Sequence, residues 1–168
     1  MQGRLNIGVI GLGRLGRVYA ADLAQRVPNA RLVAVADKQA DLAESFARQY
    51  GVPKWYRNHQ ELIGGKEVEA VAVITSTSTH REVVIDAARG GKAIFCEKPM
   101  ALSLAEAAEM LAAVESAGVF FQMGFQRRFD AGYVAAKEKV EAGVIGTPVV
   151  LVSTSRDPFR PPVEFCDP

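Results

Sequence analysis

The sequence predicts an α/β protein built on a doubly wound parallel β-sheet. Short β-branched runs alternate with longer stretches in which apolar residues recur at helical spacing, an alternation typical of βαβ units. Several of the short runs are apolar throughout, as in strands that helices cover on both faces. A glycine-rich turn joins the first strand to the first helix. Six strands with crossover helices fit the sheet order 3-2-1-4-5-6 most simply.

The first half of the sheet opens with two strand–helix pairs. Residues 5–10 (LNIGVI) predict the first strand, and apolar residues spaced three and four apart over 15–23 predict the helix after it. Residues 31–36 (RLVAVA) are nearly all apolar and predict a second, buried strand. A helix is expected over 42–50, where Gly51 supplies a left-handed stop.

The middle of the chain carries shorter elements. Residues 54–56 predict only a short third strand, and residues 59–63 predict a helical turn that ends at Gly64 and Gly65. Residues 70–74 (AVAVI) form an apolar run between turn signals and predict a buried fourth strand.

Two capping boxes mark the later helices. The sequence THRE begins at Thr79 and predicts a helix that starts there and runs to Gly90 and Gly91; SLAE predicts another over 103–116. Residues 93–96 and 119–124 predict the fifth and sixth strands.

Residues 126–168 form a region of different character. Residues 130–142 predict a helix stopped at Gly143, and residues 148–155 predict a strand for which the six-stranded sheet has no place. The Pro-rich end of the chain is expected to be irregular. We therefore expect one domain over residues 1–125, followed over residues 126–168 by a connecting helix and the start of a second domain.

The composition excludes several classes of partner. Among 168 residues, Lys and Arg total 20 and Asp and Glu total 19, for a net charge of +1, so neither nucleic acid nor an anionic membrane is expected to bind. No apolar segment approaches the roughly 18 residues that cross a bilayer, and the N-terminus resembles a strand rather than a leader. We expect a cytoplasmic protein in which Cys96 and Cys166 are reduced thiols.

The glycine turn is the first motif that carries chemistry. Gly11, Gly13 and Gly16 stand in GLGRLG between a strand and a helix. The first glycine allows a tight turn, the second lets a pyrophosphate approach the backbone, and the third lets helix and strand pack closely. Amides at the helix start then face the phosphates with the positive end of the helix dipole. This pattern predicts a dinucleotide site.

Asp37 follows the second strand, at the spacing expected for a ribose-binding acid. Its carboxylate would accept hydrogen bonds from the adenosine ribose and repel a 2′-phosphate, which favours NAD over NADP. Lys38 stands beside it and partly offsets that repulsion, so use of NADP stays open. The alternative interpretation is a solvated carboxylate that ends the strand or starts the next helix.

A run of hydroxyl residues, TSTSTH, follows the fourth strand. Ligands of open α/β sheets lie beyond the carboxyl ends of the strands, so Thr75, Ser76 and Thr77 would line the cofactor crevice; turn and cap roles are the alternative. His80 is expected in the first helical turn near the cofactor. No second ligand at metal-like spacing accompanies this histidine, so we predict no metal.

Glu97, Lys98 and Pro99 follow the fifth strand. A lysine at this edge would project toward the nicotinamide, where an ammonium suits proton exchange with a substrate hydroxyl. The alternative is a surface lysine before a turn proline. The turn also makes Lys98–Pro99 a candidate cis peptide.

Together these residues resemble the glucose–fructose oxidoreductase and inositol dehydrogenase family, written Gfo/Idh/MocA. The matching stretches are GVIGLGRLGRVYA, VAVADK, VITSTSTH, GKAIFCEKPMALS and GFQRRFDAGY. EKP is the most specific of these motifs, and GFQRRFD resembles inositol 2-dehydrogenases in particular.

The resemblance implies a Rossmann domain over residues 1–125, a connecting helix and the first strand of a truncated C-terminal α/β domain for substrate binding and oligomerisation over 126–168, and a role for each matching residue. Lys98 matches the catalytic lysine that contacts substrate and nicotinamide ribose, Glu97 the acid beside it, and Arg128 a basic residue that faces nicotinamide and substrate. The cofactor-binding residues expected from motif and resemblance together are Gly11, Leu12, Gly13, Arg14, Leu15, Gly16, Asp37, Lys38, Thr75, Ser76, Thr77, His80, Glu97, Lys98 and Arg128.

The resemblance also implies a reaction, in which a ring secondary alcohol of an inositol or sugar is oxidised to a ketone with NAD as hydride acceptor. The family's catalytic Asp and His would follow the last residue of this sequence, so we expect the chain to bind NAD and to be nearly inactive by itself. The alternative is a non-catalytic nucleotide-binding module or one half of a split enzyme. A homo-oligomer, formed through the strand at 148–155, is also expected.

Overall fold

The computed structural model describes residues 3–156. Its chain contacts divide it into two compact units, one ending at Gly124 and one beginning at Phe125. The strands are β1 (Leu5–Ile10), β2 (Ala30–Ala36), β3 (Lys54–Tyr56), β4 (Ala70–Val73), β5 (Ala93–Glu97) and β6 (Phe121–Gly124). The helices are α1 (Arg14–Gln25), α2 (Ala40–Tyr50), α3 (His59–Ile63), α4 (Thr77–Arg89), α5 (Leu104–Ala117), the 3-10 helix η1 (Gln126–Phe129) and α6 (Ala131–Glu141).

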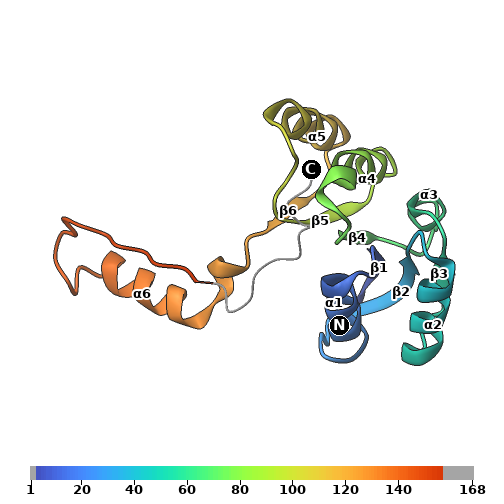
Figure 1. The fold of residues 1–168 in the computed structure, drawn as a ribbon, viewed down its shortest axis with the longest axis horizontal. Helices are drawn as coiled ribbons and strands as arrows, with labels where there is room; N and C mark the ends of the chain where they lie inside the picture. The colour runs from blue at the N-terminus through green and yellow to red at the C-terminus, as the bar shows by residue number, and fades with distance from the viewer. Residues whose placement is uncertain (1–2, 157–168) are drawn as a thin grey trace. The chain divides into compact units, whose positions relative to one another are not determined.

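The first unit is a parallel sheet with strand order β3-β2-β1-β4-β5-β6 (Figure 1). Every neighbouring pair is parallel. In the central strand, Val9 pairs with Val35 of β2 on one side and with Ala72 of β4 on the other. The predicted doubly wound sheet and its strand order are thus confirmed, and the carboxyl ends of all six strands meet at one rim.

Two buried clusters, one on each face of the sheet, explain why the strands are apolar on both sides. One cluster takes Leu62 from α3, Val84 from α4 and Met110 from α5. The other takes Ala20 from α1 and Phe46 from α2. In Figure 1, α4 and α5 lie together on one side of the sheet, whereas α1 and α2 lie on the other.

The two predicted capping boxes have different outcomes. Ser103 is the N-cap of α5 and its hydroxyl accepts the N–H of Glu106, as predicted. The prediction that a helix starts at Thr79 is wrong, because α4 begins at Thr77 with Ser76 as N-cap. The Thr79 hydroxyl donates back to the carbonyl of Ser76 at 2.9 Å, so it lies inside the first turn instead of capping it.

The second unit contains η1 and α6. Asp130 caps α6, because its Oδ1 accepts the N–H groups of Gly132 and Tyr133. The predicted strand at 148–155 is wrong as far as the structure describes it: these residues have no regular secondary structure. A strand exists only where a neighbour completes its hydrogen bonds, and no segment within residues 3–156 pairs with it. The Pro-rich end beyond residue 156 lies outside the described residues.

No helix in the described part of the chain combines the length and the apolar character needed to span a membrane.

Candidate functional site

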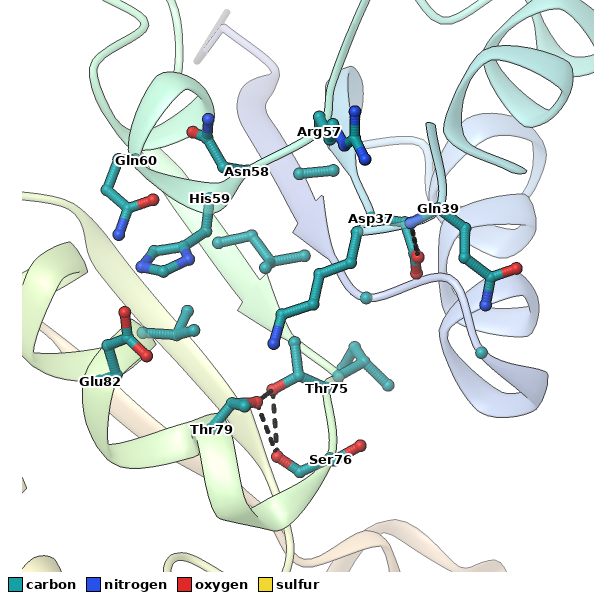
Figure 2. Close-up of a pocket in the computed structure, with 17 residues that line it drawn as sticks. Asp37, Gln39, Arg57, Asn58, His59, Gln60, Thr75, Ser76, Thr79 and Glu82 are labelled. Carbon is teal, nitrogen blue, oxygen red and sulfur yellow. Dashed lines mark hydrogen bonds between the residues drawn. The ribbon is translucent and has the colours of Figure 1, made fainter. Parts of the chain in front are cut away.

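A cavity of about 490 Å³ lies beyond the carboxyl ends of β1, β2, β3 and β4. Ligands of open α/β sheets bind at this place in the fold. The residues that line it are Ile10, Gly11, Gly13, Ala36, Asp37, Lys38, Gln39, Arg57, Asn58, His59, Gln60, Ile74, Thr75, Ser76, Thr79, Glu82 and Val83. Figure 2 shows the labelled polar side chains around this cavity, from Asp37 and Gln39 across to His59 and Glu82.

The glycine-rich loop leaves no room for side chains at two positions. Gly11 has φ +92°, and a Cβ there would lie 2.6 Å from the carbonyl oxygen of Ile74. A Cβ on Gly16 would lie 2.0 Å from the carbonyl oxygen of Gly11. Gly13, in contrast, has open space where its Cβ would stand. The backbone at Gly13 is therefore open to a close approach by a ligand.

The N-terminus of α1 is open to an anion. Helix α1 begins at Arg14 after Gly13, and no side chain hydrogen-bonds to its cap. The side chains of Arg14 and Leu15 in its first turn are exposed. Free amides at a helix start carry positive partial charge and suit a phosphate group. The loop and helix start therefore fit a pyrophosphate.

Asp37 fixes the glycine-rich loop from the neighbouring strand. Its Oδ2 accepts the N–H of Leu12 at 2.7 Å and its Oδ1 accepts the N–H of Gln39 at 2.9 Å. An ionised carboxylate has about four acceptor sites, so lone pairs remain for ribose hydroxyls. The Leu12 side chain is fully buried in the core, so what Leu12 offers the site is its backbone.

The hydroxyl run after β4 lines the opposite wall. Thr75, Ser76 and Thr79 border the cavity, and the hydroxyl oxygens of Thr75 and Thr79 lie 2.8 Å apart, within hydrogen-bonding distance (Figure 2). Thr77 lies in the first turn of α4, outside the residues that border the cavity.

His80 does not border the cavity. It is 1% exposed, and its ring connects two loops: Nδ1 lies 2.9 Å from the carbonyl oxygen of Pro99 and Nε2 lies 3.1 Å from that of Thr75. With both ring nitrogens facing carbonyl oxygens, His80 fixes the loops after β4 and β5 relative to each other. Its predicted contact with the cofactor stays a prediction.

The turn after β5 combines a buried acid with an exposed base. The Lys98–Pro99 peptide is cis, which confirms that expectation. Glu97 is 6% exposed; its Oε1 accepts the Tyr19 hydroxyl at 2.5 Å and its Oε2 accepts the Lys98 N–H at 3.0 Å. The Lys98 side chain is exposed. Burial, and then the hydrogen bond and charge of Glu97, raise the pKa of Tyr19 well above its ordinary value.

Sequence reasoning missed one wall of the cavity. This wall follows β3 and includes Arg57, Asn58 and Gln60. The predicted third strand could have indicated it, because the carboxyl end of that strand reaches the same rim of the sheet. His59 joins these residues, and its Nε2 lies 2.9 Å from Asp86 Oδ2.

The metal prediction considered only the surroundings of His80. The structure brings His59, Glu82 and Asp86 together, with one possible ligand atom from each lying within 4.8 Å of the others. That no metal binds stays a prediction.

Arg128 lies in η1, in the second unit, and is exposed. Its expected role beside nicotinamide and substrate stays a prediction.

The parallel sheet, the glycine turn, the open start of α1 and the Asp37 carboxylate beside that turn define an α/β domain of the Rossmann type. The sequence profile described as "Oxidoreductase family, NAD-binding Rossmann fold" (Gfo/Idh/MocA) matches residues 5–125. The chain belongs to this family of NAD-binding oxidoreductases.

Relatives with curated names agree with the family. The chain is 42% identical over 165 residues to the scyllo-inositol 2-dehydrogenase (NAD(+)) of Bacillus subtilis, covering 98% of this chain and 48% of that protein. It is 44% identical over 161 residues to the myo-inositol 2-dehydrogenase of Thermotoga maritima, covering 96% and 48% respectively. The chain thus spans about half the length of the curated relatives it matches.

Solved structures share the fold. A probable dehydrogenase from Thermotoga maritima superimposes with a TM-score of 0.93 at 44% identity, over 96% of this chain and 48% of that one. The scyllo-inositol dehydrogenase of Lactobacillus casei, solved with bound NAD(H) and scyllo-inositol, gives a TM-score of 0.82 at 28% identity, over 85% and 42%.

Proposed function

We propose that this chain is the NAD-binding part of a dehydrogenase that oxidises a ring secondary alcohol of an inositol or a related sugar to a ketone. The observation that carries the proposal is the arrangement at one sheet rim: the open start of α1, the Asp37 carboxylate one strand away, and the EKP turn after β5. The inositol dehydrogenases among its relatives support the substrate class.

The residues of the cavity have distinct tasks in binding. The amides at the start of α1 hold the pyrophosphate, because positive partial charge faces it there. Asp37 accepts hydrogen bonds from the adenosine ribose through its remaining lone pairs. Thr75 and Ser76 border the opposite side of the same cavity. When bound, NAD supplies the hydride acceptor.

The charges around Asp37 set the preference between NAD and NADP. Asp37 repels a 2′-phosphate, which favours NAD. Lys38 and Arg57 border the same cavity and carry the opposite charge. We infer that NAD is preferred and that NADP binds more weakly.

Lys98 is the residue that exchanges a proton with the substrate hydroxyl. Its exposed ammonium stands on a turn fixed by Glu97 on one side and by His80 on the other. A lysine held in place can act as a general acid or base. We infer that the other substrate-positioning groups belong to the half of the relatives' length that this chain does not span, so the 168-residue chain binds NAD and turns over slowly.

Calorimetric titration of the chain with NAD and NADP, followed by an assay of NADH formation with myo- and scyllo-inositol, tests the proposal. We expect NAD binding and little turnover. Turnover restored by adding a polypeptide equivalent to the second half of the Thermotoga maritima relative would support a two-part enzyme. NAD binding with no turnover under either condition would favour a non-catalytic nucleotide-binding module. Absence of NAD binding at millimolar concentration would overturn the proposal.

A further inference from the structure

The Glu97 carboxylate is a buried acid at the end of β5. It is 6% exposed, and each of its oxygens accepts one hydrogen bond: Oε1 from the Tyr19 hydroxyl and Oε2 from the Lys98 N–H. Buried ionised groups are costly unless donors satisfy them. These two donors therefore determine where the carboxylate sits.

Tyr19 reaches Glu97 from a different element. It lies on α1, 78 residues earlier in the chain, and its ring packs against Phe95 with centroids 5.6 Å apart. This aromatic contact holds the ring independently of the hydroxyl. The hydroxyl thereby joins the helix that begins at the glycine-rich loop to the turn that carries Lys98.

The carboxylate has little room to adopt another position. A Cβ built on Gly124, in the neighbouring strand β6, would lie 2.9 Å from Glu97 Oε1. The glycine thus brings the backbone of β6 close to the carboxylate. With Gly124 on one side and Tyr19 on another, the carboxylate is held facing the Lys98 amide.

We propose that Tyr19 is a positioning residue that fixes the Lys98 backbone through the Glu97 carboxylate. The His80 ring contacts the carbonyl of Pro99 at 2.9 Å, so the Lys98–Pro99 turn is held from both ends. The role of Tyr19 in catalysis rests on the proposed function of Lys98. The hydrogen-bonded connection from Tyr19 through Glu97 to Lys98 is independent of that function.

Tyr19→Phe removes the hydroxyl and keeps the ring on Phe95. Amide hydrogen exchange, measured by NMR on the 168-residue chain, reports the Lys98 N–H directly. Losing one hydrogen bond to a charged group leaves the carboxylate loosely held, so we expect the Lys98 amide to exchange about tenfold faster. The amides of Val71 and Ala72 in β4 should be unchanged. Tyr50→Phe is the matched control, because Tyr50 stacks on Phe46 and its hydroxyl makes no hydrogen bond within residues 3–156.

The exchange pattern separates a positioning role from a structural one. Faster exchange confined to Lys98 supports the proposal, whereas equal acceleration of all amides or an unchanged Lys98 overturns it. Should Tyr19→Phe fail to fold, Glu97→Gln provides the second test. It keeps the size of the side chain, and its neutral oxygen accepts more weakly, so the same local acceleration is expected.

Turnover and cofactor binding connect the inference to the reaction. In an assay of NADH formation by the chain together with the added second-half polypeptide, Tyr19→Phe should lower kcat by roughly tenfold and leave the KM for NAD unchanged, because Lys98 is displaced while the dinucleotide site is intact. An equal effect on both constants would overturn the catalytic part. If the Lys98 amide responds as expected but the chain does not bind NAD, the Tyr19–Glu97–Lys98 connection is supported and the proposed function is the part that fails.

Discussion

Asp37 combines the ribose-binding role proposed above with a contact to the glycine-rich loop that its place in the sequence did not indicate. The ribose-side role follows from its position after the second strand, but the same carboxylate accepts the Leu12 N–H and so shapes the glycine-rich loop. Substituting it therefore affects both selectivity between cofactors and the stability of the loop.

Two substitutions separate these effects. Asp37→Asn removes the charge, keeps an oxygen that accepts from Leu12 and loses the acceptor for Gln39, so NADP should bind more tightly while the melting temperature falls less than in Asp37→Ala. Asp37→Ala leaves the Leu12 N–H unpaired; NAD affinity should fall about tenfold or more, and the free energy of unfolding by about 1–3 kcal/mol. Calorimetric titration and urea unfolding measure both quantities. Equal stability of the two variants would contradict the loop role.

Cys96 makes stability depend on alkaline pH. Its thiol is buried, and burial, followed by the charge of Glu97, raises its pKa from 9.0 to about 12. Between these values the unfolded chain has released a proton that the folded chain retains, so its contribution is complete below about pH 9 and declines as the pH rises.

Urea unfolding at about pH 7 and about pH 10.5 tests this dependence. The chain should lose about 2 kcal/mol between them through Cys96. Cys96→Ala should be less stable at neutral pH, because it leaves a cavity, yet lose less on the way to high pH. An identical alkaline decline in both proteins would show that Cys96 does not contribute.

At the scale of elements, the two capping motifs show how local signals compete with tertiary structure. Ser103 caps α5 because the chain reaches it in an extended conformation, with φ −142° and ψ 159°. Thr79 has the same motif, but α4 has already begun at Thr77 and the Thr79 hydroxyl bonds to Ser76. A capping motif therefore identified both helices and the exact start of only one.

The Ser103 cap should have a measurable effect on stability. Ser103→Ala removes the acceptor for the Glu106 N–H and should lower the free energy of unfolding by about 1 kcal/mol. Ser116→Ala, at an exposed position near the other end of α5, is the control and should change it by less than about 0.5 kcal/mol. Equal effects in urea unfolding would argue against the cap.

At the scale of the whole molecule, the second unit carries an exposed apolar run. Val149, Val150, Leu151 and Val152 are between 79% and 93% exposed. Contiguous apolar surface of this kind favours association, and the unpaired backbone of these residues can add to another strand. We propose that the chain self-associates through this run.

Light scattering coupled to gel filtration tests self-association. The chain should form dimers or larger species at high concentration, and Val150→Lys with Val152→Lys should shift it to the monomer, since charges on an edge prevent pairing. Val144→Lys with Thr147→Lys adds the same charge to the same unit outside the run and should not. A monomeric chain at all concentrations would contradict the proposal.

The sequence by itself determined the doubly wound sheet, its strand order, and the glycine turn, Asp37 and the EKP motif at its rim, because each depends on local spacing and on the rule that parallel strands end at one edge. Tertiary structure decided which remote groups meet: Tyr19 with Glu97, His80 with the Pro99 carbonyl, and the residues after β3 with the cavity. It also left residues 148–155 without a strand in the described structure. A hydrogen bond between distant segments forms only when the fold brings its donor and its acceptor together. A local sequence pattern contains only one of these two groups, so it cannot predict the bond.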